Sequence, residues 1–290
     1  MIYHLSNAYL SVSVSDLGAE LISVCEQNGI EYIWQGDKRF WEGHAPWLFP
    51  ICGRLWEGHY TWKGSSYEMD IHGFARVEPF ELVEQTDTTL VLTLTENERT
   101  LAQYPFPFRL TVTYTLTDRS LSAKAVVENT GEEVLPASFG YHPGFCVPLG
   151  EGRFEDYRLT FGTPCQPKKI LLSPTCFVTP EREELPLSEG RSLPLRHELF
   201  ANDAIFVENM ASSVTLESDK SEKNVTICYN DAPYVGFWQA YGDDVPYVCV
   251  EPWYGLPSTD GRVDDFATKS DMLHLEAGEK KEFSFEMIFR

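Results

Sequence analysis

Alternation of apolar and polar side chains with a period of two residues is the feature that most constrains the fold of this chain. Leu90, Leu92 and Leu94 share one face of residues 90–95, and the same alternation runs through residues 108–116. A period of two is typical of a half-buried β-strand and does not fit an amphipathic helix. These segments are therefore predicted to be strands.

Short turn-forming segments at residues 118–120 and 129–131 separate this pattern from further strands at 121–127 and 134–141. Such spacing is typical of a meander, so we expect neighbouring strands to be antiparallel. More strands are expected at residues 12–14, 21–24, 157–161, 214–216, 225–227, 234–240, 246–250 and 283–289. Only short helical turns are expected, at residues 196–200 and 38–42.

The number of strands indicates an all-β fold with two packed sheets or one closed sheet. A single flat sheet of this size would leave its apolar faces in water. We therefore predict a large antiparallel β-sandwich or a barrel, with a ligand bound on its concave side or rim. The 290 residues contain no repeat or linker-like tract, which favours one domain over residues 1–290.

Composition excludes several classes of protein. A hydrophobic fraction of 43% with 13% aromatic residues is typical of a globular chain. The net charge of −21, without basic runs, argues against nucleic acid and anionic membranes as partners and favours a neutral small ligand. No secretion signal or membrane-length apolar run is apparent. Seven scattered cysteines without a Cys-x-x-Cys pair favour free thiols and a cytoplasmic location.

Two basic segments are candidates for a binding site. Arg54 lies within the apolar and aromatic residues 49–56, where a guanidinium needs a partner: either a structural salt bridge, or a sugar hydroxyl or an acid. His72 precedes Gly73, which allows close approach of a ligand, although a hydrogen-bonded core histidine is the alternative. Arg76 is either a structural anchor or a contact for phosphate.

A histidine ends the strand expected at residues 134–141. Alternation places His142 on the same face as Gly140 and opposite Phe139 and Tyr141, so space is left beside the imidazole. Pro143 then ends the strand and places His142 at a sheet edge or rim. These features favour a catalytic or ligand-binding role over a structural one.

Two carboxylates complete the set of candidates. Glu251 ends the apolar strand at residues 246–250, where poor solvation raises the pKa of a carboxyl group toward that of a base near neutral pH. The alternative is a structural pair with a buried arginine. Asp203 gives a weaker signal, because Asn-Asp before an apolar run is also an ordinary turn.

Taken in order, five short segments resemble a known family. They are Gly-Arg at 53–54, His-Gly-Phe-Ala-Arg at 72–76, Tyr-His-Pro-Gly-Phe at 141–145, Asn-Asp-Ala at 202–204 and Glu-Pro-Trp at 251–253. Over nearly its whole length the chain resembles the aldose 1-epimerase (galactose mutarotase-like) superfamily, most closely its LacX-like branch. The resemblance implies a large antiparallel β-supersandwich that uses no cofactor and no metal.

The resemblance also implies a role for each candidate. Glu251 is expected to be the general base and His142 the general acid in exchanging the α and β anomers of an aldohexose. His72, Arg54 and Asp203 are expected to hold the sugar and steady charge. The aromatic candidates for packing against the C–H face of a pyranose are Trp253, Trp238, Phe74 and Phe145.

Several functional alternatives stay open at this point. A related branch acting on hexose 6-phosphates shares the segment that contains Arg76, so a phosphosugar is one of them. Others are a carbohydrate-binding or sensing protein without turnover, a glycoside hydrolase using Asp203 and Glu251, and a metal enzyme using His72, His142 and Glu251. The expected oligomeric state is a monomer or a homodimer.

Overall fold

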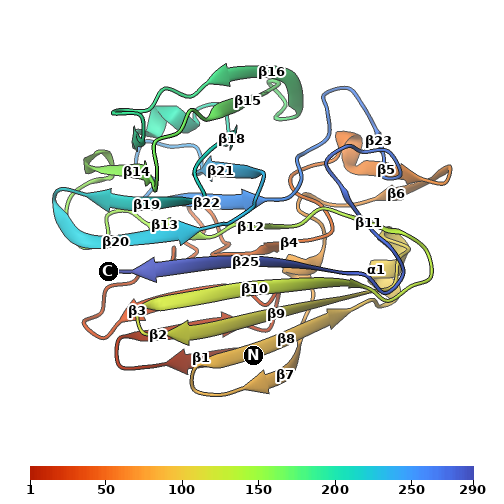
Figure 1. Cartoon of the computed structure of the whole chain (residues 1–290), viewed down its shortest axis with the longest axis horizontal. Coiled ribbons are helices and arrows are strands. Elements are labelled where there is room, and N and C mark those ends of the chain that lie inside the picture. Colours follow the sequence, from red (N-terminus) through yellow and green to blue (C-terminus); the bar gives the residue numbers. More distant parts are fainter.

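Two large antiparallel sheets form most of the structure, a computed structural model that describes residues 1–290 (Figure 1). The nine-stranded sheet contains, in spatial order, β17 (Ser192–Pro194), β14 (Tyr157–Phe161), β19 (Ser213–Ser218), β20 (Ser221–Cys228), β25 (Lys280–Phe289), β10 (Ser120–Asn129), β9 (Phe108–Thr117), β8 (Thr89–Thr95) and β7 (Glu81–Gln85). The eight-stranded sheet contains β16 (Val178–Glu184), β15 (Lys168–Leu172), β18 (Ile205–Glu208), β21 (Tyr234–Trp238), β22 (Tyr247–Trp253), β12 (Gly140–Tyr141) and β4 (Trp47–Leu48), with β13 (Gly144–Cys146) also paired to β22.

Smaller elements surround these sheets. Three short sheets are formed by β1 (Ile2–Ser6), β2 (Leu10–Ser15) and β3 (Leu21–Glu26); by β23 (Asp264–Asp265), β5 (His59–Trp62) and β6 (Ser65–Glu68); and by β11 (Leu135–Ala137) with β24 (Leu273–Leu275). The helical elements are α1 (Glu98–Gln103) and the 3-10 turns η1 (Trp56–Gly58), η2 (Ala75–Val77), η3 (Phe154–Asp156) and η4 (His197–Phe200). No helix in the chain has both the length and the apolar character needed to cross a membrane.

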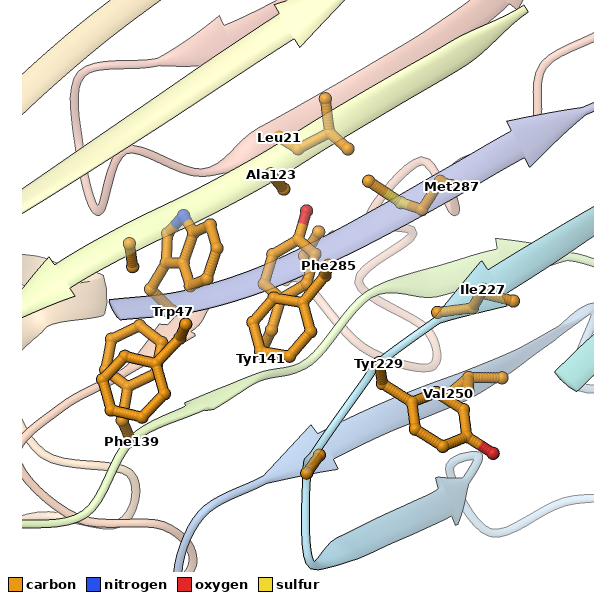
Figure 2. Close-up of a cluster of buried hydrophobic side chains, with 14 of the residues drawn as sticks. Leu21, Trp47, Ala123, Phe139, Tyr141, Ile227, Tyr229, Val250, Phe285 and Met287 are labelled. Atoms are coloured by element: carbon orange, nitrogen blue, oxygen red, sulfur yellow. The ribbon is translucent and has the colours of Figure 1, made fainter. Parts of the chain in front are cut away.

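The apolar faces of the two large sheets pack against each other. Phe139 stacks on Phe283 with ring centroids 4.3 Å apart, and Tyr141 stacks on Phe285 at 5.7 Å. Figure 2 shows Phe139 and Tyr141 in one cluster with Phe285, and with Trp47 beside them. The main buried cluster contains 69 residues, from both large sheets and from the smaller sheets and loops around them. The predicted all-β sandwich is therefore confirmed, in the form of packed sheets rather than a barrel.

Alternation located the strands β2, β3, β8, β9, β10, β14, β19, β20, β21, β22 and β25, but it did not predict β1, β5, β6, β7, β15, β16 or β18. The expected strand at 134–141 is two short strands, β11 and β12, in different sheets. The strand expected to end at Val250 continues through Trp253. The turn at 196–200 is confirmed by η4, whereas residues 38–42 form turns without a helix, and α1 was not predicted. Helix α1 is capped by Asn97, whose side chain accepts a hydrogen bond from the Thr100 backbone N–H.

Candidate active site

Strand β22 presents a polar and aromatic stripe on one face. Because side chains alternate along a strand, Val248 and Val250 point into the core between the sheets, and every second residue points the other way. The stripe consists of Tyr247, Cys249, Glu251 and Trp253, all of them buried. Glu251 thus lies inside the strand and not at its end, which corrects the sequence-based placement.

The register of β22 places His142 directly opposite Glu251. Gly140 of β12 pairs with Trp253 and Gly144 of β13 pairs with Cys249, so position 142 falls across from position 251. The Nε2 atom of His142 lies 3.1 Å from Oε2 of Glu251. Two residues more than a hundred positions apart in the sequence therefore form one close acid–base pair, here called the dyad.

Burial controls protonation of the dyad. Loss of solvent raises the pKa of the Glu251 carboxyl well above its ordinary range, and the nearby Asp203 carboxylate raises it further. Burial also lowers the pKa of His142 to about 3, with the Arg76 guanidinium acting in the same direction. Both shifts favour a carboxylic acid beside a neutral imidazole. The direction of both shifts places the exchangeable proton of the dyad on the Glu251 carboxyl group, 3.1 Å from the His142 imidazole.

His72 contributes a second imidazole of fixed tautomer. Its Nδ1 atom accepts a hydrogen bond from the Gly53 backbone N–H at 3.1 Å, and the backbone N–H of His72 donates to the Gly53 carbonyl at 2.8 Å. Burial lowers the pKa of His72 well below its ordinary value, with the charge of His142 and two arginines adding to the effect. The ring is therefore neutral with its proton on Nε2, and it meets the His142 ring edge-on at 5.4 Å.

The glycine after His72 is required by the backbone. Gly73 has φ +70°, and a Cβ atom there would lie 2.3 Å from the carbonyl oxygen of Phe49. That carbonyl also accepts hydrogen bonds from the backbone N–H groups of Phe74 and Ala75. Gly73 thus lets the segment carrying His72 dock against the segment carrying Arg54.

Arg54 and Asp203 form an ion pair at the solvent-accessible side of the site. Their closest atoms, Nη2 and Oδ2, are 3.6 Å apart, and their side chains are 40% and 27% exposed. Asp203 follows η4 with φ +76°, a left-handed conformation that aspartate tolerates better than most residues. The pair satisfies the predicted need of Arg54 for a partner and leaves both side chains accessible to a ligand.

Arg76 differs from Arg54 in having no acidic partner. Its Nε donates to the backbone carbonyl of Ile71 at 3.3 Å, and none of the ion pairs of the chain involves its guanidinium. The side chain is half-buried. Arg76 therefore brings an uncompensated positive charge to the site.

These groups line one cavity of about 600 Å³. The structure brings together all seven residues selected from the sequence: Arg54, His72, Arg76, His142, Asp203, Glu251 and Trp253. Of the other aromatic candidates, Trp238 lines the cavity, whereas Phe74 and Phe145 are buried in the core and do not. Their predicted contact with a ligand is wrong, because both side chains point into the apolar interior.

Trp41 is a cavity residue that the sequence analysis missed. Its ring lies 4.9 Å from the ring of His142, and Trp238 lies 5.6 Å from the same imidazole. The indole N–H of Trp34 donates to the Trp41 carbonyl and fixes the loop. The signal available in the sequence was the adjacent pair Phe40-Trp41 in an otherwise polar loop, where large aromatic side chains often contact ligands.

The candidate metal ligands are grouped differently from the expectation. One potential ligand atom from each of His142, Cys249 and Glu251 lies within 4.8 Å of the other two. His72 is not part of this group. The predicted set of His72, His142 and Glu251 is therefore not the set that the structure brings within ligating distance.

Comparison with known structures defines the class of fold. The chain superposes on a galactose mutarotase related enzyme from Lactobacillus acidophilus with a TM-score of 0.95 and 34% identity, covering 100% of this chain and 97% of the other. A galactose mutarotase-like protein from Lactobacillus casei gives a TM-score of 0.93 and 32% identity, with 100% of both chains covered. The fold is thus a galactose mutarotase-like β-sandwich.

The family follows from the sequence comparisons. The model of the family described as aldose 1-epimerase matches residues 1–286. The chromosomal LacX protein of Lactococcus lactis subsp. lactis is 33% identical over 294 residues, which covers 97% of each chain. The chain belongs to the aldose 1-epimerase family, and this membership supports a mutarotase-type function, that of an isomerase.

Proposed function

We propose that the chain is an aldose 1-epimerase that interconverts the α and β anomers of a hexose by opening and reclosing the ring. The observation that carries the proposal is the dyad, an imidazole and a carboxyl group 3.1 Å apart that line a cavity of about 600 Å³. Ring opening removes a proton from the C1 hydroxyl and adds a proton to the ring oxygen. An acid and a base that exchange one proton suit such a reaction.

The dyad performs the reaction in two symmetric halves. The shared proton passes to His142, and Glu251 then takes the proton of the C1 hydroxyl while His142 protonates the ring oxygen. The bond between C1 and the ring oxygen breaks and leaves an aldehyde. After rotation about the C1–C2 bond, the C5 hydroxyl attacks the opposite face of the carbonyl. His142 takes back its proton, Glu251 returns its own to O1, and the proton count of the dyad is unchanged.

The remaining cavity residues position the sugar. In this proposal the Nε2–H of His72 donates to a sugar oxygen, and Arg54 and Asp203 bind hydroxyl groups at the accessible side. Trp253 and Trp238 offer apolar surface to the C–H face of the ring. General acid–base catalysis contributes about 10²–10⁴ per well-placed group, which is sufficient for ring opening without a cofactor.

Polarimetry tests the proposal directly. Freshly dissolved α-glucose and α-galactose change optical rotation slowly without enzyme, and catalytic amounts of the protein should accelerate the change. Binding of either sugar without acceleration would indicate the carbohydrate-binding alternative. Release of the aglycone from an aryl glycoside would indicate the hydrolase alternative, and loss of mutarotation with a chelator would indicate a required metal.

Replacement of Arg54 by alanine should weaken sugar binding more than it slows turnover. A hydrogen bond to a charged group contributes about 1.5–3 kcal/mol, so KM should rise by about tenfold or more. Arg262→Ala, an exposed arginine outside the cavity lining, is the matched control and should leave KM unchanged. An unchanged KM in Arg54→Ala would show that the ion pair with Asp203 serves only the fold.

A hexose 6-phosphate is the second candidate substrate, and it is favoured by the unpaired charge of Arg76. The net charge of −21 repels such an anion at long range, but a local guanidinium acts at short range. On this reading, Arg76→Gln should raise KM for glucose 6-phosphate about tenfold and leave KM for glucose within twofold. Equal effects on both sugars would remove the phosphosugar from consideration.

The proposed setting is the cytoplasm, with the protein acting as a monomer or a homodimer of single-domain chains. All seven cysteines are free thiols, as expected for a reducing compartment.

A further inference from the structure

Cys249 adds a third metal-ligating group to the dyad. It precedes Glu251 by two residues on β22, so both side chains point to the same side of the sheet. Cys249 pairs with Gly144, two residues after His142 on the neighbouring segment. The Cys249 sulfur, a His142 ring nitrogen and a Glu251 oxygen all lie within 4.8 Å of one another, and all three residues are buried.

The chemistry of these three donors selects one class of cation. One nitrogen, one sulfur and one oxygen suit borderline-soft divalent ions such as Zn²⁺, whereas Mg²⁺ and Ca²⁺ prefer oxygen ligands. Zinc bonds of about 2.0–2.3 Å in a tetrahedron place ligand atoms about 3.5 Å apart. Small side-chain rotations bring three atoms already within 4.8 Å to that spacing.

Two features around the three donors favour a cation, and one opposes it. The Oε1 atom of Glu251 and the Nδ1 atom of His142 are buried without a hydrogen-bond partner. The Asp203 carboxylate acts on Glu251 from nearby, while Arg54 is already paired with Asp203. The Arg76 guanidinium, which also lines the cavity, opposes a cation at His142.

We propose that His142, Cys249 and Glu251 bind a Zn²⁺-class cation that inhibits the enzyme, with the fourth coordination position open to the cavity. Binding releases the thiol proton of Cys249 and the shared proton of the dyad to solvent. The metal then occupies the lone pairs that would otherwise carry protons to and from a substrate. The inhibitory part rests on the proposed function, whereas the binding part does not.

The test measures binding and activity separately. Isothermal titration of the purified protein with Zn²⁺ should show one tight site per chain, and Co²⁺ should give a thiolate-to-metal charge-transfer absorption. In Cys249→Ala the Zn²⁺ affinity should fall by at least about 10–100-fold, the loss typical of removing a residue that only supports a ligand, and the Co²⁺ band should disappear. Cys176→Ala, which removes a half-buried thiol of the cavity lining that is not one of the three proposed ligands, is the matched control and should bind Zn²⁺ normally. Mg²⁺ should have no effect on either protein.

In the activity arm, Zn²⁺ should stop mutarotation by the wild type, EDTA should restore it, and Cys249→Ala should need a much higher Zn²⁺ concentration for the same inhibition. Unchanged Zn²⁺ affinity or an unchanged Co²⁺ spectrum in Cys249→Ala would overturn the site. Cys249→Ser, closer in size, repeats the comparison if the alanine variant does not fold. A protein that binds Zn²⁺ through Cys249 but has no mutarotase activity would refute the proposed function and retain the metal site.

Discussion

Replacing Glu251 by glutamine should lower kcat for mutarotation by about 10²–10⁴ while leaving the fold intact. The amide has nearly the same volume as the carboxyl group but neither takes up nor releases a proton in the relevant range. The glutamine N–H group can still donate to Nε2 of the neutral His142 imidazole. In the wild type this Nε2 atom lies 3.1 Å from the Glu251 carboxyl group. Polarimetry gives the rate, and thermal unfolding followed by circular dichroism should give a melting temperature within a few degrees of the wild type.

Glu42→Gln is the matched control for this variant. Glu42 also lines the cavity, but its side chain is 69% exposed and pairs with Lys38. Its replacement should leave kcat within about twofold, since exposed ion pairs contribute little. A Glu251→Gln variant that is folded and as active as Glu42→Gln would show that Glu251 is not the base.

Replacing His142 by asparagine should cause a loss of kcat of similar size. The substitution removes the ring nitrogen that contacts Glu251 and leaves the buried carboxyl group without its proton partner. Because the two residues act as one unit, the double variant with Glu251→Gln should be scarcely slower than either single variant. Additive losses would instead indicate that each residue acts independently.

His72→Asn provides a comparison within the same cavity. His72 has φ +66°, which asparagine tolerates, and the asparagine Oδ1 atom can accept the Gly53 N–H in place of Nδ1. This variant should therefore retain its fold and lose mainly the contact of Nε2 with the sugar. We expect KM to rise more than kcat falls, in contrast to His142→Asn. Larger loss of kcat in His72→Asn than in His142→Asn would reverse the two assigned roles.

The fold could be predicted well from the sequence because alternation is a local property. A period of two in β9 and β10 is visible without knowledge of their partners, and each strand buries the face that the pattern indicates. One error occurs in β22, where the strand departs from the pattern. Glu251, Pro252 and Trp253 do not resemble a strand interior, yet β22 continues through them because its neighbours β12 and β21 supply the pairing.

The site could be predicted only in part, because its geometry depends on strand register. Sequence identified His142 and Glu251 as unusual, but the pairing of Gly140 with Trp253 that sets them opposite each other is a long-range contact with no local signal. The same register brings Cys249 close to the dyad. In the sequence, Cys249 is only one of seven scattered cysteines, and nothing local marks it as different. Trp41 was missed because it lies in a loop without periodicity.

Exchange spectroscopy by NMR tests the central claim most directly, because it observes the two anomers at equilibrium and needs no coupled reaction. With a hexose labelled with ¹³C at C1, the wild-type protein should produce exchange cross-peaks between the α and β signals at a rate proportional to enzyme concentration, and Glu251→Gln should produce almost none. An anomer exchange rate that is the same with wild type, with Glu251→Gln and without protein, for every hexose and hexose phosphate tried, would contradict the account.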